Sequence, residues 1–197
     1  MAIYAVSDIH GQYKQWKQLK NFLKKDDKCY ILGDIIDRGK DGWKILKEVF
    51  NDKRFIFLKG NHEEMLIDDV IYDMHTFIEM LKDENHNYYI NKIIHSPSEL
   101  VIVNNKNQKI IMCHAGYNYQ EKDKGDVLWN REHLNQVWSV PKDTYMIHGH
   151  TPNEDGKIKK YNNNIYNIDC GCFFTKVLGL LNLDTFEELY FDGKNTY

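Results

Sequence analysis

The chain has 197 residues, 42% of them hydrophobic, and a formal net charge of −3. This length suits one domain with a full hydrophobic core and is short for two, so we expect a single domain over residues 1–197. The slightly acidic balance lacks the basic excess that is typical of nucleic-acid-binding proteins, so we expect no nucleic-acid partner.

The first 60 residues contain three apolar runs that predict strands, at 3–6, 29–32 and 55–58. Apolar residues at helical spacing follow the first two runs, which predicts amphipathic helices over 13–23 and 43–50. Repeated strand–helix units indicate a mostly parallel sheet with crossover helices. In such a sheet, ligands bind at the carboxyl ends of the strands.

The hydrophobic pattern of the sequence changes twice after residue 63. Residues 64–98 have a mainly helical pattern, and we expect them to form a helical cap inserted beside the site. Strand-like runs then follow at 100–103, 110–113, 145–147, 165–168, 177–183 and 188–191. The asparagine-rich stretches 104–107 and 162–164 predict hairpin turns between these strands.

The four cysteines, Cys29, Cys113, Cys170 and Cys172, lie in or beside apolar runs. We expect reduced, buried thiols, while half of a zinc or redox site at Cys170 and Cys172 stays open as the alternative. The strand at 3–6 begins directly after Met1, which predicts no signal peptide, and no apolar run approaches ~20 residues. We therefore expect a cytoplasmic protein with no membrane partner.

Five short motifs carry the chemistry, and each follows an apolar strand-like run. They are Asp8-Ile9-His10-Gly11, Gly33-Asp34-Ile35-Ile36-Asp37-Arg38-Gly39, Gly60-Asn61-His62-Glu63, Cys113-His114-Ala115-Gly116 and His148-Gly149-His150-Thr151. One such motif alone is weak evidence. Five of them in chain order indicate a two-metal site.

The motifs predict how two metal ions are held. Asp8 and His10 are two residues apart, so in an extended segment their side chains leave on the same face and can bind one ion. Asp34 can bridge this ion to a second one, and the remaining ligands of the second ion are Asn61, His114 and His150. Carboxylate oxygen with imidazole nitrogen favours Mn²⁺, with Fe or Zn²⁺ as alternatives, over Ca²⁺. A pair of such ions lowers the pKa of a bridging water, which can then attack phosphorus in line.

Four further residues are candidates for the catalytic step. Arg38 can hold two phosphate oxygens as negative charge builds, and Asn61 lies beside the same phosphate position. Arg131 is a second phosphate-binding candidate, with a surface ion pair as its alternative. His62 is placed to protonate the leaving group, with Asp37 fixing its tautomer and raising its basicity.

This motif set resembles the phosphoprotein phosphatase branch of the calcineurin-like metallophosphoesterases over residues 8–171. The resemblance implies a four-layer α/β/β/α sandwich with a binuclear metal site at the carboxyl ends of the strands. It also implies the same ligands and the same roles for His62, Asp37, Arg38 and Arg131. Other superfamily members often carry a further histidine where this chain has Pro152, which fits this branch.

The function predicted first is that of a metal-dependent serine/threonine protein phosphatase. Symmetrical hydrolysis of diadenosine tetraphosphate is the alternative, because relatives with the same motifs carry it out. Acidic residues at the start of the cap favour a basic phosphopeptide over a polyanionic nucleotide: Glu63, Glu64, Asp68, Asp69 and Asp73. A non-catalytic phosphate-binding scaffold is a third possibility, which the complete ligand set argues against. The oligomeric state is left open.

Five histidines outside the ligand set are interpreted as surface or packing residues: His75, His86, His95, His133 and His148.

Overall fold

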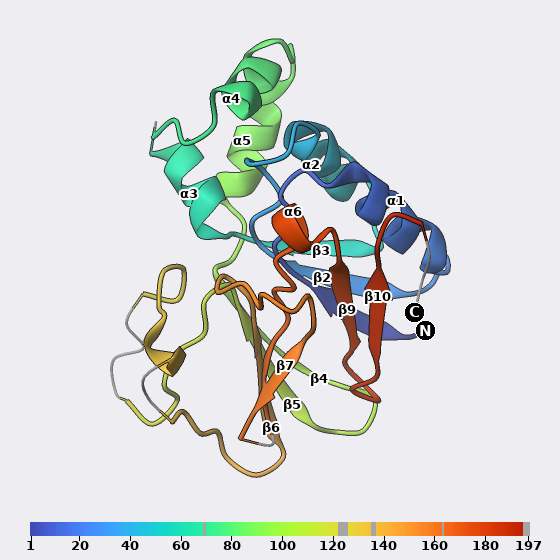
Figure 1. Cartoon of the computed structure of the whole chain (residues 1–197), viewed down its shortest axis with the longest axis vertical. Helices are drawn as coiled ribbons and strands as arrows, with labels where there is room; N and C mark the ends of the chain where they lie inside the picture. Colours follow the sequence, from blue (N-terminus) through green and yellow to red (C-terminus); the bar gives the residue numbers. More distant parts are fainter. Residues whose placement is uncertain (69, 122–125, 135–136, 163, 195–197) are drawn as a thin grey trace.

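The computed structural model describes residues 1–68, 70–121, 126–134, 137–162 and 164–194. Its centre is a pair of five-stranded mixed sheets (Figure 1). The first sheet has the order β10-β9-β1-β2-β3. Its strands are β1 (Ile3–Val6), β2 (Lys28–Leu32), β3 (Phe55–Leu58), β9 (Leu178–Asn182) and β10 (Glu188–Phe191). Strands β1, β2 and β3 are parallel as predicted, whereas β9 and β10 are antiparallel additions.

The second sheet has the order β4-β5-β6-β8-β7. Its strands are β4 (Glu99–Val103), β5 (Lys109–Cys113), β6 (Thr144–His148), β7 (Lys159–Tyr161) and β8 (Ile165–Asn167). The central strands β5, β6 and β8 are parallel, and the two edge strands are antiparallel. The expected hairpin turn at 104–107 joins β4 to β5, and the described part of 162–164 lies between β7 and β8.

Side-chain alternation along β1 separates two cores. Val6 packs with the helices α1 (Tyr13–Phe22) and α2 (Gly42–Asn51), whereas Ala5 points into the core between the sheets. Trp16 and Leu46 lie in the helix-facing core, and both are fully buried. The helices therefore cover one face of the first sheet, and the second sheet covers the other.

A smaller core lies on the outer face of the second sheet, where Met146 and Ile111 pack with Tyr117 and Trp138. Within the described residues, the segment over this face contains one short 3₁₀ turn, η1 (Glu132–Leu134), and otherwise irregular chain. The expected α/β architecture is present with its two sheets, and this segment stands where the four-layer sandwich implied by the resemblance places helices.

The predicted helical stretch contains three helices: α3 (Asn61–Ile67), α4 (Met74–Leu81) and α5 (His86–Ile94). They lie together at one end of the molecule in Figure 1, beyond the strands. The first of them starts inside the third motif, three residues earlier than expected. That residues 64–98 form a cap insertion within one domain stays a prediction.

Besides η1, a strand and a helix were not predicted. Strand β7 has the sequence Lys159-Lys160-Tyr161, whose polar residues at the sheet edge lack apolar alternation. Helix α6 (Cys172–Thr175) is a single turn between Gly171 and Lys176, both with left-handed backbone. Such short elements are set by the surrounding tertiary structure and leave little periodic signal.

The cysteines behave as expected, since all four are buried and free. Cys170 packs between the sheets and Cys172 packs in the helix-facing core, so the two thiols enter different cores. Burial raises the pKa of both thiols well above its usual range. None of the helices among the described residues combines the length and apolar character needed to span a bilayer.

Candidate metal centre

The five motifs come together where the carboxyl ends of parallel strands from both sheets meet. Asp8, Asp34 and Asn61 follow β1, β2 and β3, while His114 and His150 follow β5 and β6. Backbone hydrogen bonds tie the loops to one another: His10 N donates to Asp34 O (2.9 Å) and Gly149 N donates to His114 O (2.7 Å). All six predicted ligands are at most 5% exposed.

The backbone of the site departs from the extended geometry that we predicted for Asp8 and His10. Their φ angles are +54° and +44°, so both residues are left-handed and the prediction of an extended segment is wrong. The side chains nevertheless converge, with Asp8 Oδ1 3.9 Å from His10 Nε2. Positive φ also occurs at Asp34, Asp37, Arg38 and His150. Such strain persists only where surrounding contacts impose it, and it concentrates at functional sites.

Asp34 lies between two groups of potential ligands. Its Oδ2 is 3.5 Å from His10 Nε2, and its Oδ1 is 3.4 Å from His114 Nε2. One group joins His10, Asp34 and His62, and the other joins Asp34, His114 and His150, with ligand atoms within 4.8 Å of one another in each. A carboxylate whose two oxygens face different groups has the placement of a bridging ligand.

The second group also contains Asn61. Its Oδ1 is 2.9 Å from His114 Nε2 and 3.0 Å from His150 Nδ1, and the two ring nitrogens are 3.1 Å apart. Two imidazole nitrogens, an amide oxygen and a carboxylate oxygen thus meet at one buried point. This donor set suits a borderline divalent cation.

Tautomers provide a test of whether these residues fit a metal. His10 Nδ1 lies 2.9 Å from Ile36 O and His114 Nδ1 lies 2.6 Å from Leu32 O. A carbonyl oxygen only accepts, so Nδ1 must donate in both rings, and the lone pair of each neutral ring is on Nε2. Both Nε2 atoms face the Asp34 carboxylate, which is the orientation that metal-binding histidines need. The residues present therefore fit divalent ions.

The charges of this buried cluster are strongly coupled. Burial alone raises the Asp34 pKa, but His114, His10 and His62 lower it overall, which keeps Asp34 ionised. Burial lowers the pKa of His114, yet the charge and hydrogen bond of Asp34 outweigh it and raise that pKa to about 10. A metal ion that binds here replaces a proton between His114 and its neighbours, so binding releases protons.

His62 stands beside the ligands and is paired with Asp37. His62 Nδ1 donates to Asp37 Oδ2 at 2.7 Å, with both side chains buried. Burial lowers the His62 pKa, but the hydrogen bond from Asp37 and the charge of Asp34 raise it overall. Its Nε2 lies 3.8 Å from Asp34 Oδ2 and is the nitrogen that faces the cluster.

A pocket of about 220 Å³ opens above these groups. Arg38 and Arg131 both line it, together with Asn61 and His62, so the structure brings the predicted phosphate-binding residues to one place. Both arginines are exposed. Among the described residues no carboxylate lies within ion-pair distance of Arg131.

The family model for calcineurin-like phosphoesterases matches residues 1–179. The chain belongs to this family. This family is metal-dependent.

Known relatives of this phosphoesterase include the symmetrical bis(5'-nucleosyl)-tetraphosphatase of Wigglesworthia glossinidia brevipalpis. The two are 33% identical over 144 residues, which cover 66% of this chain and 50% of the relative. That of Buchnera aphidicola subsp. Acyrthosiphon pisum (strain 5A) is 33% identical over 134 residues, covering 61% and 46%. The chain thus spans about half the length of the curated relatives it matches.

Solved structures share the fold of the phosphoesterase at low identity. A protein proposed to be a diadenosine tetraphosphatase superposes with a TM-score of 0.74 at 16% identity, covering 95% of this chain and 91% of that one. A serine/threonine phosphatase from Saccharomyces cerevisiae gives 0.57 at 13% identity, covering 85% and 66%. The fold thus occurs both in a protein named as a diadenosine tetraphosphatase and in a serine/threonine phosphatase, so the fold does not decide between these two substrate classes.

Glu63 of the phosphoesterase is the main correction to the sequence analysis. It is fully buried, and its carboxylate accepts the backbone N–H groups of Asp34 (2.9 Å), Ile35 (2.8 Å), Ile36 (3.3 Å) and Gly60 (3.0 Å). It therefore holds the loop that carries Asp34 against the start of α3. Glutamate at the third position of a helix is a known capping signal, which the sequence analysis did not use here.

The start of the cap therefore presents less negative charge at its surface than expected. Glu63 is buried, Glu64 pairs with Lys59 at 2.9 Å, and Asp73 accepts the N–H groups of Arg38 and His75. Asp69 lies outside the described residues. Repulsion of a polyanionic nucleotide by cap acids is therefore wrong for the buried Glu63 and weakened for the ion-paired Glu64.

Asp169 is a site residue that sequence reasoning missed. It is buried next to the metal motifs, accepts the Gly171 N–H at 2.8 Å, and its backbone oxygen accepts the Asn153 N–H at 2.9 Å. Burial and the charge of Asp8 raise its pKa well above its usual range. The signal was a carboxylate directly after the predicted strand 165–168, the same pattern that identified Asp8.

The remaining histidines of the phosphoesterase lie outside the ligand cluster. His148 is fully buried with its ring 4.9 Å from that of His133, and both pack near Trp138. His75 and His95 are exposed, and His86 is half-buried. Their predicted roles in packing and at the surface agree with these positions.

Proposed function

We propose that this chain is a binuclear metal-dependent hydrolase that cleaves dinucleoside tetraphosphates symmetrically into two nucleoside diphosphates. The observation that carries the substrate class is the 33% identity to a symmetrical bis(5'-nucleosyl)-tetraphosphatase over 66% of the chain. With Glu63 buried and Glu64 paired with Lys59, the acidic cap gives a weaker reason to prefer phosphoproteins. The four free, buried cysteines support a cytoplasmic location.

In the proposed mechanism, Asp8, His10 and Asp34 hold one divalent ion, and Asp34, Asn61, His114 and His150 hold the other. Mn²⁺ is the expected metal, with Fe or Zn²⁺ as alternatives. When bound, two such ions supply an activated water and neutralise charge on the phosphate.

Side chains of the protein bind the phosphate and protonate the leaving group. Arg38 and Arg131 line the pocket over the ligands, and their guanidinium groups bind the oxygens of the reacting phosphate. Asn61 lines the same pocket and adds a polar contact. His62 donates a proton from Nε2 to the leaving diphosphate oxygen, because Nδ1 is engaged with Asp37 at 2.7 Å. Asp37 thereby fixes the tautomer and favours the protonated ring.

The test compares two substrates on the Mn²⁺-loaded protein. ADP release from diadenosine tetraphosphate is measured beside phosphate release from a phosphothreonine peptide, with His62→Asn as the catalytic control. The proposal expects faster turnover of the tetraphosphate and loss of that turnover in His62→Asn. Faster peptide turnover identifies a protein phosphatase instead, and near-normal rates in a folded His62→Asn variant contradict the mechanism.

A further inference from the structure

A second hollow lies beside the metal centre, on the side of Arg38. It has a volume of about 800 Å³, within the range of small-molecule sites. The loops after β1 and β2, helix α6 and the chain after β10 form its walls. We call it the basic groove because five cationic side chains line it: Lys14, Arg38, Lys40, Lys176 and Lys194. Arg38 also lines the 220 Å³ pocket over the metal ligands, so the two hollows share a wall.

The charge of the basic groove is opposite to that of the chain. Only two carboxylates, Asp41 and Asp192, line it against the five cations, whereas the whole chain has a formal net charge of −3. Helix α1 also begins at this groove, with no acidic residue in its first turn and no side-chain cap among the described residues. Its N-terminal dipole adds to the positive potential. A concave surface with this potential concentrates anions.

Contacts between distant parts of the chain hold the groove in shape. The buried Gln15 donates from Nε2 to Lys176 O at 2.8 Å, and Gly193 N donates to Gln18 Oε1 at 2.8 Å. Lys176 has a left-handed backbone with φ +62°, and its Nζ donates to Gln12 Oε1 at 3.1 Å. A groove fixed in this way loses little ordering entropy when a ligand binds.

The groove also offers an aromatic surface. Phe173 lines it with 37% of its surface exposed, and Lys176 Nζ lies 5.2 Å from its ring centroid. The other aromatic lining residue, Tyr13, already has Lys44 Nζ over its ring at 3.5 Å. Phe173 is the more accessible of the two rings, because it is exposed and its lysine lies farther from the ring than that of Tyr13. Nucleobases stack on such rings with little dependence on their identity.

We infer that the basic groove binds one nucleoside 5′-diphosphate half of the substrate, with its diphosphate at Lys14 and Lys176 and its base against Phe173. This inference rests on the proposed function. Symmetrical cleavage adds water across the central P–O–P bridge and releases two nucleoside diphosphates. Because Arg38 lines both hollows, a half that extends from the metal centre past Arg38 enters the groove.

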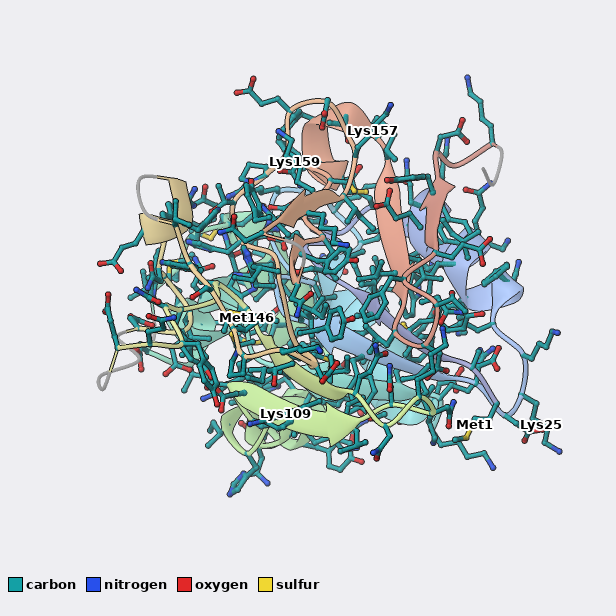
Figure 2. All side chains as sticks on the ribbon, turned by 90° about the horizontal axis from the view of Figure 1, so that it is seen from below. Met1, Lys25, Lys109, Met146, Lys157 and Lys159 are labelled. Atoms are coloured by element: carbon teal, nitrogen blue, oxygen red, sulfur yellow. The ribbon has the colours of Figure 1, made fainter. Side chains whose placement is uncertain are left out.

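The test is equilibrium binding of ADP to the full-length, Mn²⁺-loaded protein by calorimetry. The groove variant is Lys14→Glu with Lys176→Glu, and the matched control is Lys25→Glu with Lys106→Glu. Lys25 follows the far end of α1 and projects from the edge of the molecule in Figure 2, and Lys106 is exposed in the β4–β5 turn. The groove variant should bind ADP at least about tenfold more weakly than the control, since two charge-assisted contacts are reversed. Equal ADP affinity in the two double variants overturns the inference.

A second pair of variants tests the base position. Phe173→Ala should weaken ADP binding and leave inorganic pyrophosphate binding unaltered, whereas Phe174→Ala, at the next position of the same helix, should affect neither. If Phe173→Ala binds ADP as the wild type does, the base does not stack there and this part of the inference is wrong. If it weakens pyrophosphate equally, the groove recognises phosphate alone, which also contradicts the base position.

Kinetics separate this inference from the proposed function. In the groove variant, kcat/KM for diadenosine tetraphosphate should fall at least about tenfold more than kcat/KM for p-nitrophenyl phosphate. A wild-type protein that hydrolyses only p-nitrophenyl phosphate contradicts the proposed function, and the ADP titration then decides the groove independently. ADP that binds the wild type no more tightly than inorganic phosphate contradicts the groove as a nucleotide site.

Discussion

Gly149 gives a direct test of how the two sheets assemble the metal centre. It lies between the end of β6 and His150, and its φ is not in the left-handed region, so alanine brings no conformational penalty there. A Cβ atom at this position would meet Ser7 Oγ at 2.1 Å and Asp8 Oδ2 at 2.2 Å, where ordinary contacts begin at 3.4 Å. The same Asp8 oxygen accepts the His150 N–H at 3.0 Å. Gly149→Ala must therefore displace Asp8 by about 1 Å, a shift that can cost about 100-fold in rate.

The expected magnitudes follow from this clash. Overpacking costs about 1–3 kcal/mol in the free energy of unfolding. In addition, the first ion loses its Asp8 ligand, so we expect Mn²⁺ affinity to fall at least about tenfold and kcat/KM by about 100-fold. Urea unfolding in EDTA measures the first effect, and calorimetric Mn²⁺ titration with steady-state kinetics measures the others.

Gly156→Ala is the matched control. Its φ is +70°, but a Cβ atom there meets nothing closer than 3.5 Å, so the cost is conformational only, about 1–2 kcal/mol. Both variants should therefore lose similar stability, and only Gly149→Ala should lose metal affinity. Retention of wild-type Mn²⁺ affinity in Gly149→Ala would refute the placement of Asp8 beside the β6 loop.

Three other predictions concern the site. His62→Asn should lower kcat by about 10²–10⁴ and Asp37→Asn by about 10–100, with Mn²⁺ affinity retained in a calorimetric titration. Mn²⁺ at 100 times its dissociation constant should stabilise the protein by about 2.7 kcal/mol for each site that it fills, so that even one filled site raises Tm by about 5–10 °C over the EDTA-treated protein. Unchanged melting would show that the native state holds no metal. Glu63→Ala removes the acceptor of four backbone donors and should lower the free energy of unfolding in urea by at least about 3 kcal/mol. The control Glu64→Ala removes only an ion pair and should cost less than about 1 kcal/mol. Equal losses in the two variants would contradict the capping role.

Most of the strands and the chemistry of the site are local properties, which is why the sequence predicts them. The runs 3–6 and 55–58 coincide with β1 and β3 because buried parallel strands are continuous apolar segments. Asp8, Asp34 and Asn61 follow such runs, so their meeting at one sheet edge follows from the parallel order. That inference requires no knowledge of long-range packing.

Other features depend on contacts between distant segments. The left-handed backbone at Asp8 and Asp34 is fixed by neighbouring loops, and it cannot be predicted from the local conformational preference of aspartate. Glu63 has the same formal charge as the exposed Glu84, and only the fold shows that Glu63 is turned inward onto the Asp34 loop. The predicted repulsion of nucleotides is weaker than expected for this reason, since it counted the buried Glu63 as part of the surface.

The net charge of −3 is a poor guide to the partner for a related reason. Several of the chain's carboxylates are buried around the metal cluster: Asp8, Asp34, Asp37, Glu63 and Asp169. Two divalent ions bound there would bring four positive charges and would outweigh the carboxylates of Asp8, Asp34 and Asp37 locally. The surface that a substrate meets is then set by Arg38, Arg131 and the lysines of the basic groove. An acidic protein that buries its carboxylates beneath metals therefore presents a positive face, which is the complement that a tetraphosphate chain requires.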